Sequence, residues 1–159
     1  MAYYDKIVDG CVISSIEEPD YTYLAIIDYV GPTNITSITI PEDVENILEG
    51  VFDQCKSLKS ITWNAKSCGT WGAFDAIKQN ITSFVFGDKV EYIPSDLCKG
   101  MSKLTSVTIP ESVKSIGSGV FEGTGIYTNK SNWKNGALYI NNCLVAVDKK
   151  LVNKDIIIP

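Results

Sequence analysis

The sequence contains a phrase that returns every 23 residues. Residues 35–40 read ITSITI, and close variants follow at 58–63, 81–86 and 104–109 without an insertion or a deletion between copies. The third residue of the phrase is serine in every copy, and the fourth and sixth residues are apolar. A fixed period of about 20 to 29 residues is typical of a solenoid, in which coils stack in a row. The repeat therefore predicts a solenoid of about four coils.

Each copy has the pattern of a short strand with one buried face. In Ile38-Thr39-Ile40 one polar residue separates two apolar ones, as expected where side chains alternate across a strand. Pro41 and Pro110 end two of the strands, because proline has no N–H to donate to the next rung. We expect the inward residues to form two buried columns along the stack. The columns comprise Ile38, Ile61, Phe84 and Val107, and Ile40, Trp63, Phe86 and Ile109.

The fourth copy also points to a family. Residues 104–123, LTSVTIPESVKSIGSGVFEG, closely resemble the repeat unit of the BspA-like leucine-rich repeat family. The resemblance extends over about residues 35 to 127, and in the first copy Leu48 replaces the usual glycine. It implies a mainly β, leucine-rich-repeat-like solenoid with short turn or helical segments. The matching residues of the fourth copy are Leu104, Val107, Ile109, Pro110, Val113, Ile116, Gly117, Val120 and Phe121.

The second copy departs from this pattern. Its segment 64–80, NAKSCGTWGAFDAIKQN, keeps the length but loses the proline, the valine and isoleucine positions and the glycine. Two interpretations follow for Trp71 and Phe74. Either the coil is locally reshaped around a buried tryptophan, which is the simpler explanation, or the two rings form an aromatic contact patch. Aromatic side chains are enriched at contact sites, but any tryptophan has that property.

The flanks have the pattern of solenoid ends. Short alternating runs fill the first 33 residues, and Asp9-Gly10 between two of them is typical of a hairpin turn. The stretch around Asn141-Asn142 has the pattern of a second hairpin. We therefore expect flanking β-hairpin caps: an N-terminal β-meander over residues 1–33 and a C-terminal hairpin after the repeat solenoid of residues 34–129. The hairpin and the start of a further coil occupy residues 130–159.

The end of the sequence repeats the beginning of a coil. Residues 155–159, DIIIP, match the strand ending at Ile40-Pro41. We expect them to pair as a strand whose open edge promotes edge-to-edge self-association, because an unpaired edge templates pairing with another chain. No secretory leader precedes residue 1, which fits a trimmed fragment of a longer repeat protein as well as a native cytoplasmic chain.

Composition excludes several functions. The net charge is −5 and all 14 basic residues are lysines, whereas nucleic-acid binding usually needs a basic stripe with arginine. The chain has no histidine, which excludes catalytic triads, Cys-His dyads and most zinc sites. No apolar run is long enough to cross a membrane. We expect no cofactor, no nucleic-acid partner and no membrane insertion.

Carboxylates and thiols do not indicate a catalytic centre either. Paired acids can hydrolyse glycosides, but Glu42, Asp88 and Glu111 occupy the same position in three of the four coils, in the turn after the strand, where acids mainly solvate a surface. The five cysteines form no C-x-x-C pair, and burial as small apolar side chains is favoured for Cys55 and Cys98. We expect neither catalytic nor metal-binding residues, and no enzyme.

Two functions fit these observations. The first is a secreted or cell-surface module that binds a protein or a glycan through the exposed strand face. Members of the family that the chain resembles, from anaerobic gut and oral bacteria and some parasitic protists, are typically associated with surface adhesion. The second is a structural spacer or an assembly component of a larger complex. The predicted contact residues are the outward strand positions and one lysine at their edge: Ser37, Thr39, Lys59, Ser60, Thr62, Ser83, Val85, Ser106 and Thr108.

Overall fold

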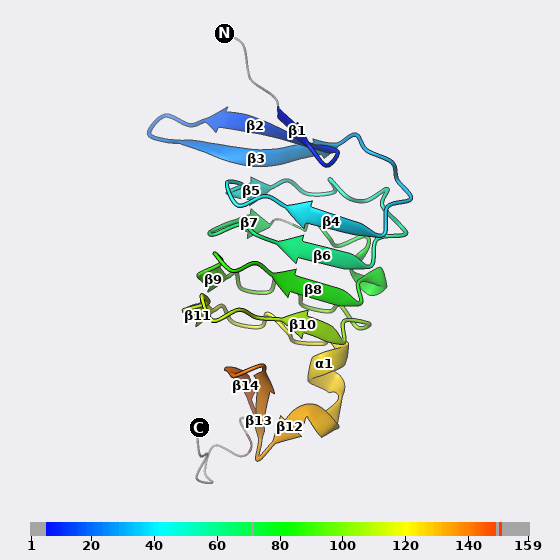
Figure 1. The fold of residues 1–159 in the computed structure, drawn as a ribbon, viewed down its shortest axis with the longest axis vertical. Helices are drawn as coiled ribbons and strands as arrows, with labels where there is room; N and C mark the ends of the chain where they lie inside the picture. The colour runs from blue at the N-terminus through cyan, green and yellow to red at the C-terminus, as the bar shows by residue number, and fades with distance from the viewer. Residues whose placement is uncertain (1–5, 71, 149, 151–159) are drawn as a thin grey trace.

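Four parallel strands, one from each repeat, form the main sheet of the molecule. The computed structural model describes residues 6–70, 72–148 and 150, and the strands lie one above another along the long axis (Figure 1). Ser37 lies beside Ser60, Ser60 beside Ser83 and Ser83 beside Ser106, so the 23-residue register is confirmed. In chain order the strands are β4 (Ser37–Ile40), β6 (Ser60–Trp63), β8 (Ser83–Phe86) and β10 (Ser106–Thr108).

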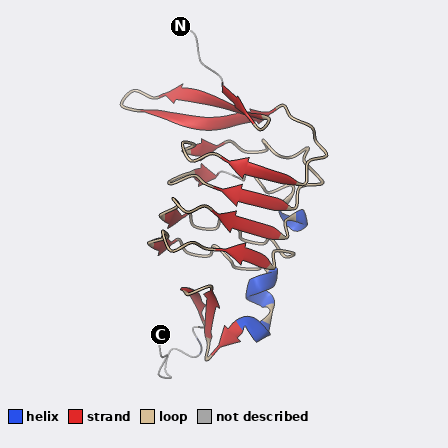
Figure 2. Ribbon diagram, in the orientation of Figure 1, coloured by secondary structure: helices blue, strands red, loops and turns tan. Residues whose placement is uncertain are grey.

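Shorter strands form the other side of the coils (Figure 1). β5 (Asn46–Ile47) pairs with β7 (Gly69–Thr70), and β9 (Tyr92–Ile93) pairs with β11 (Ser115–Ile116). Turns connect the two sides, with one 3-10 helix, η1 (Lys78–Asn80), and little other helix (Figure 2). Within the described residues no pairing joins β7 to β9. The interruption falls in the second coil, where the sequence leaves the repeat pattern.

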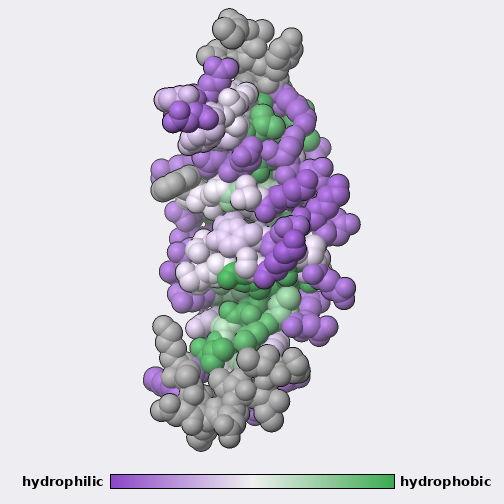
Figure 3. Space-filling view, turned by 90° about the vertical axis from the view of Figure 1, so that its left-hand side faces the viewer, coloured by the Kyte–Doolittle hydropathy of each residue, from purple (hydrophilic) through white to green (hydrophobic). Residues whose placement is uncertain are grey.

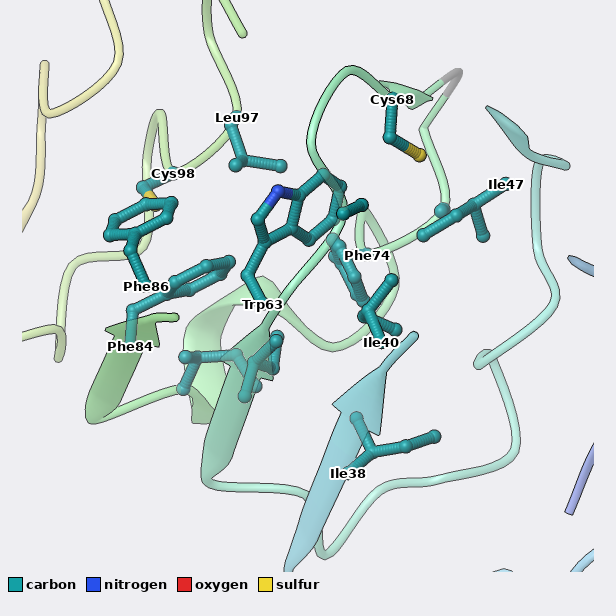
Figure 4. Close-up of a cluster of buried hydrophobic side chains, with 14 of the residues drawn as sticks. Ile38, Ile40, Ile47, Trp63, Cys68, Phe74, Phe84, Phe86, Leu97 and Cys98 are labelled. Atoms are coloured by element: carbon teal, nitrogen blue, oxygen red, sulfur yellow. The ribbon is translucent and has the colours of Figure 1, made fainter. Parts of the chain in front are cut away.

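Seven of the eight inward residues of the main sheet are buried, as the repeat predicts, whereas the eighth, Val107, is only partly buried. Ile61, Trp63 and Phe84 have no exposed side-chain surface. The ring centroids of Trp63 and Phe84 lie 6.2 Å apart, and those of Phe84 and Phe86 lie 4.9 Å apart (Figure 4). Each coil alone has too few apolar residues for a core, so the stack is stabilised by contacts between neighbouring coils.

An N-terminal β-meander covers the first coil. It consists of β1 (Lys6–Val8), β2 (Cys11–Glu17) and β3 (Thr22–Tyr29), all antiparallel. Asp9 and Gly10 form the first turn with φ of 50° and 84°, as the Asp-Gly hairpin signal predicts. β3 then pairs with β5, so the meander continues the row of short strands.

A helical turn and a three-stranded sheet follow the fourth coil (Figure 1). Thr124 caps the helix by accepting a hydrogen bond from the Tyr127 N–H, and the strands after it form an antiparallel sheet. Asn141-Asn142 lies between the last two strands, as predicted. The predicted strand at 155–159 lies outside the described residues. The elements are α1 (Gly125–Thr128), η2 (Lys130–Asn132), β12 (Trp133–Lys134), β13 (Ala137–Ile140) and β14 (Cys143–Val147).

The C-terminal end of the core is less covered than its middle. Val90 and Ile93 in the third coil are fully buried, whereas the equivalent Val113 and Ile116 in the fourth coil are only partly buried. Figure 3 shows hydrophobic side chains gathered toward this end of the short-strand side. None of the helices in the described part of the chain has the length and apolar character needed to span a membrane.

Candidate functional site

The outward residues of the main sheet form one polar surface, here called the Ser/Thr face. The strand register places the serines in one row across the sheet, and Thr39, Thr62, Val85 and Thr108 in a second row. Neighbouring members of a row are separated by about 4.8 Å, the spacing of paired strands. Every member is exposed or half-buried. The Ser/Thr face comprises Ser37, Thr39, Ser60, Thr62, Ser83, Val85, Ser106 and Thr108.

The hydroxyl groups of this face are available to a partner. Within the described residues, no side-chain hydrogen bond involves any of them, although nearby Thr82 donates to the Lys59 carbonyl oxygen at 3.3 Å. A serine or threonine hydroxyl can donate one hydrogen bond and accept two. Lys59 is exposed at the edge of the face. The surface therefore offers a regular array of hydrogen-bonding groups and little charge.

Charged side chains lie in the turns beside the sheet and connect neighbouring coils. Glu42 contacts Lys89 at 3.0 Å and Lys66 at 4.0 Å, so one carboxylate connects residues from three coils. The hydrogen bond from Lys89, with a smaller contribution from Lys66, lowers the pKa of Glu42. Both partners are exposed, and exposed pairs contribute little to stability. This group of charges fits a solvated turn.

Phe74, one of the two residues of the predicted aromatic patch, does not lie on the surface. Its side chain is only 5% exposed, and its ring stacks on that of Phe52 with centroids 5.5 Å apart and an interplanar angle of 5°. The second coil lacks the usual valine and isoleucine at its turn, and Phe74 fills part of the core there (Figure 4). Phe74 is thus a core residue, and Trp71 lies outside the described residues.

All five cysteines are free thiols, and four of them are buried. Burial raises the pKa of Cys68 to about 12 and that of Cys11 to about 12, and it also raises the pKa of Cys98. A thiol at such a site behaves as a small apolar side chain. Within residues 6–70, 72–148 and 150, no group of three or more His, Cys, Asp or Glu side chains is placed to hold a metal ion.

In the native protein we expect Ellman's reagent to modify the half-buried Cys143 first. Cys11, Cys55, Cys68 and Cys98 should react only as the chain unfolds, because only the thiolate attacks the reagent and burial disfavours it. Burial raises the pKa of the Cys68 thiol in the folded state from an unfolded value of 9.0 to about 12. Its contribution to the free energy of unfolding is therefore complete below pH 9.0 and is lost as the pH rises from there toward 12. Absorbance traces with and without guanidinium measure the rate at which the thiols are modified. Fast modification of several thiols in the native state would contradict this order of reactivity.

The sequence pattern did not indicate the clefts at the C-terminal end. One groove of about 610 Å³ lies between β10 and the C-terminal sheet. A second cleft of about 660 Å³ lies beside Tyr127, Lys130 and Trp133, with the Lys130 ammonium 5.2 Å from the centre of the Trp133 ring. Both clefts arise because the chain leaves the solenoid after the fourth coil. The sequence marks the end of the solenoid, because the 23-residue phrase does not recur directly after the copy that ends at residue 109. It does not indicate that clefts form there.

Comparison with known proteins gives a family and several distant structures. A family model described as BspA type leucine rich repeat region, in six copies, matches residues 29–144. No curated protein matches the chain.

Among solved structures, a leucine-rich repeat protein from Bacteroides ovatus is 24% identical with a TM-score of 0.42, over 56% of this chain and 23% of that one. The T. pallidum leucine-rich repeat protein is 21% identical with a TM-score of 0.45, over 69% of this chain and 64% of that one. A leucine-rich cell surface protein from Faecalibacterium prausnitzii is 21% identical with a TM-score of 0.34, over 74% of this chain and 46% of that one. The chain thus spans less than two thirds of the length of each of them.

Proposed function

The chain belongs to the BspA type leucine-rich repeat family, and from this membership we propose that it is a non-enzymatic protein-binding module that acts through the Ser/Thr face. The observation that carries the proposal is the array of hydroxyl groups across β4, β6, β8 and β10, which have no hydrogen-bond partner in the described part of the protein. Solenoids commonly bind partners along such extended faces, because each repeat presents an equivalent side chain.

We further propose that the module works outside the cell or at the cell surface, in adhesion. This rests on the typical association of the family with surface adhesion. A polar face with few charges suits a protein partner whose own surface is mixed and polar, because most non-obligate interfaces are about as apolar as the remaining surface. A glycan, which offers hydroxyl groups of its own, is the alternative ligand class for the same face.

A structural role is the second candidate, and one observation favours it. The fourth coil exposes part of its apolar interior at Val107, Val113 and Ile116, and an end of this kind can hold a further component of a larger assembly. In that case the coils would set a distance and the Ser/Thr face would have no ligand. The same binding experiment separates the two functions.

We expect the double variant Thr62→Glu/Thr108→Glu to lose binding at least about tenfold, because each carboxylate crowds the neighbouring hydroxyls and carries an unpaired charge into the contact. Binding is measured on immobilised extracellular-matrix proteins and on a glycan array. The melting temperature should change little, since both positions point outward. Thr22→Glu/Thr33→Glu is the matched control, because these exposed threonines lie outside the main sheet.

Unchanged binding by the Thr62/Thr108 variant would move the site away from the Ser/Thr face. Binding to glycans alone would replace the protein ligand by a glycan. If the parent chain bound neither panel, the structural role would be favoured over adhesion.

A further inference from the structure

The open edge of β10 borders a groove that adjoins the Ser/Thr face and shares Ser106 with it. The C-terminal sheet does not continue the main sheet but turns away from it below β10 (Figure 1). The groove of about 610 Å³ between them is lined on one side by Thr105, Ser106 and Val107. The other side is formed by residues of α1, of the segment after it and of β13.

Backbone groups of β10 face this groove. In a parallel ladder, successive residues direct their N–H and C=O groups alternately to the two neighbouring strands. Ser106 donates its N–H to the Thr82 carbonyl oxygen at 3.2 Å, so the backbone groups of Ser106 point toward β8. The carbonyl oxygen of Thr105 and both backbone groups of Val107 therefore point to the groove, and no hydrogen bond to them is found within the described residues.

The described residues close this edge at both ends but leave its middle open. At one end, the Ile126 N–H donates to the Leu104 carbonyl oxygen at 2.9 Å. At the other end, the Ile109 N–H donates to the Asn141 side-chain oxygen at 3.3 Å. These two bonds take the positions that a next strand would occupy. The open stretch at 105–107 has the length of one short strand.

The floor of the groove is the unfinished end of a core column. Val107 stands in register with Phe84, Ile61 and Ile38. These three side chains are 0%, 0% and 5% exposed, whereas Val107 is only partly buried. An apolar side chain placed on Val107 would continue the column. A segment that adds to this edge therefore needs an apolar residue at its centre.

Among the described residues, the walls of the groove are mostly polar and carry a single charge. Lys134 is the only charged residue among the described residues that line it, and no carboxylate lines it, although the chain has 19 acidic residues. Amide and hydroxyl side chains supply the other polar groups, among them Asn129 and Ser131. The Tyr139 hydroxyl oxygen is buried and has no hydrogen-bond partner in the described structure. The charge of the groove thus favours an acidic occupant.

We propose that this groove binds an extended segment of a partner protein, which adds to β10 as a fifth parallel strand. The segment places a β-branched apolar residue on Val107 and an acidic residue near Lys134. Strand addition derives its affinity from main-chain hydrogen bonds and its specificity from alternate side chains. The proposal rests on the β10 edge and is independent of a ligand on the Ser/Thr face.

Two fluorescein-labelled peptides test the proposal with the full 159-residue chain. One has the blocked sequence Glu-Thr-Val-Thr-Glu, and the other has lysine in place of both glutamates. By fluorescence anisotropy we expect the acidic peptide to bind at least about tenfold more tightly than the lysine peptide. Amide exchange at Val107 should be fast in the free chain and slow when the acidic peptide is bound.

Substitutions at Val107 isolate the backbone contact. Val107→Pro removes the N–H that faces the groove, so we expect binding to weaken at least about tenfold. Val107→Ile keeps both the N–H and an apolar β-branched side chain, and binding should stay within about twofold of the parent. Thr39→Pro makes the equivalent change on β4, at the opposite edge of the main sheet, and should leave binding unchanged. Melting curves of the three variants show whether each is folded.

Several results would overturn the proposal. These are equal affinity for the two peptides, no detectable binding, or equal affinity of the Val107→Pro and Val107→Ile variants. Slow exchange at Val107 in the free chain at every concentration would assign the groove to a segment of the chain itself. Protection that appears only as the protein concentration rises would assign it to a second copy.

Discussion

Replacing Phe84 with alanine is expected to lower the free energy of unfolding by about 3–5 kcal/mol. Phe84 has no exposed surface, and its ring lies between those of Trp63 and Phe86. Truncation leaves a cavity in the middle of the stack, where neighbouring coils on both sides prevent collapse. The change is measured by denaturant unfolding followed by tryptophan fluorescence.

Tyr92→Ala is the matched control, because it also removes an aromatic ring but from a side chain that is 39% exposed. Its cost should stay below about 1 kcal/mol. If the two variants unfolded at the same denaturant concentration, Phe84 would not be the central core residue that the register assigns.

A Gly117→Ala variant should lose about 1–3 kcal/mol of stability. Gly117 lies against the backbone of the third coil, and a Cβ at this position would lie 2.6 Å from the Cα of Ser95 and closer still to its backbone nitrogen. The contact is fixed in place, since the Gly117 N–H donates to the Ile93 carbonyl oxygen at 2.8 Å. Relief of the clash therefore requires the coils to separate locally. Thermal unfolding of the variant and the parent measures the loss.

Gly87→Ala provides the comparison for this clash. There the added Cβ meets mainly the side-chain amide of Asn64, which can rotate away, so the cost should be below about 1 kcal/mol. An equal loss in both variants would show that removing a glycine, and not contact with the neighbouring coil, determines the effect.

The architecture follows from the sequence because its signals are periodic and local. A 23-residue register fixes which residues stack, as Ser37, Ser60 and Ser83 do. The Asp9-Gly10 turn needs only its own two residues to favour a hairpin, because both adopt a positive φ there. Such features do not depend on how distant parts of the chain are arranged.

Features that depend on packing could not be predicted in the same way. Phe74 belongs to the coil that leaves the pattern, and its ring is buried against that of Phe52, a contact that the repeat does not predict. The indole N–H of Trp63 is buried without a hydrogen-bond partner in the described structure, although isoleucine occupies the equivalent position in the first and fourth coils. The groove at β10 exists because the C-terminal sheet turns aside, and no repeat pattern governs that turn.

The direction of the strand pairing also determines how the module responds to tension. The coils are stacked along the long axis (Figure 1), so the hydrogen bonds of the main sheet run in that direction. Force applied between the two ends of the stack peels these bonds apart one strand at a time, because each coil contacts only its neighbours. Releasing one coil adds about 75 Å of extended chain. Under load the module therefore lengthens in steps of one coil, and each step absorbs mechanical work.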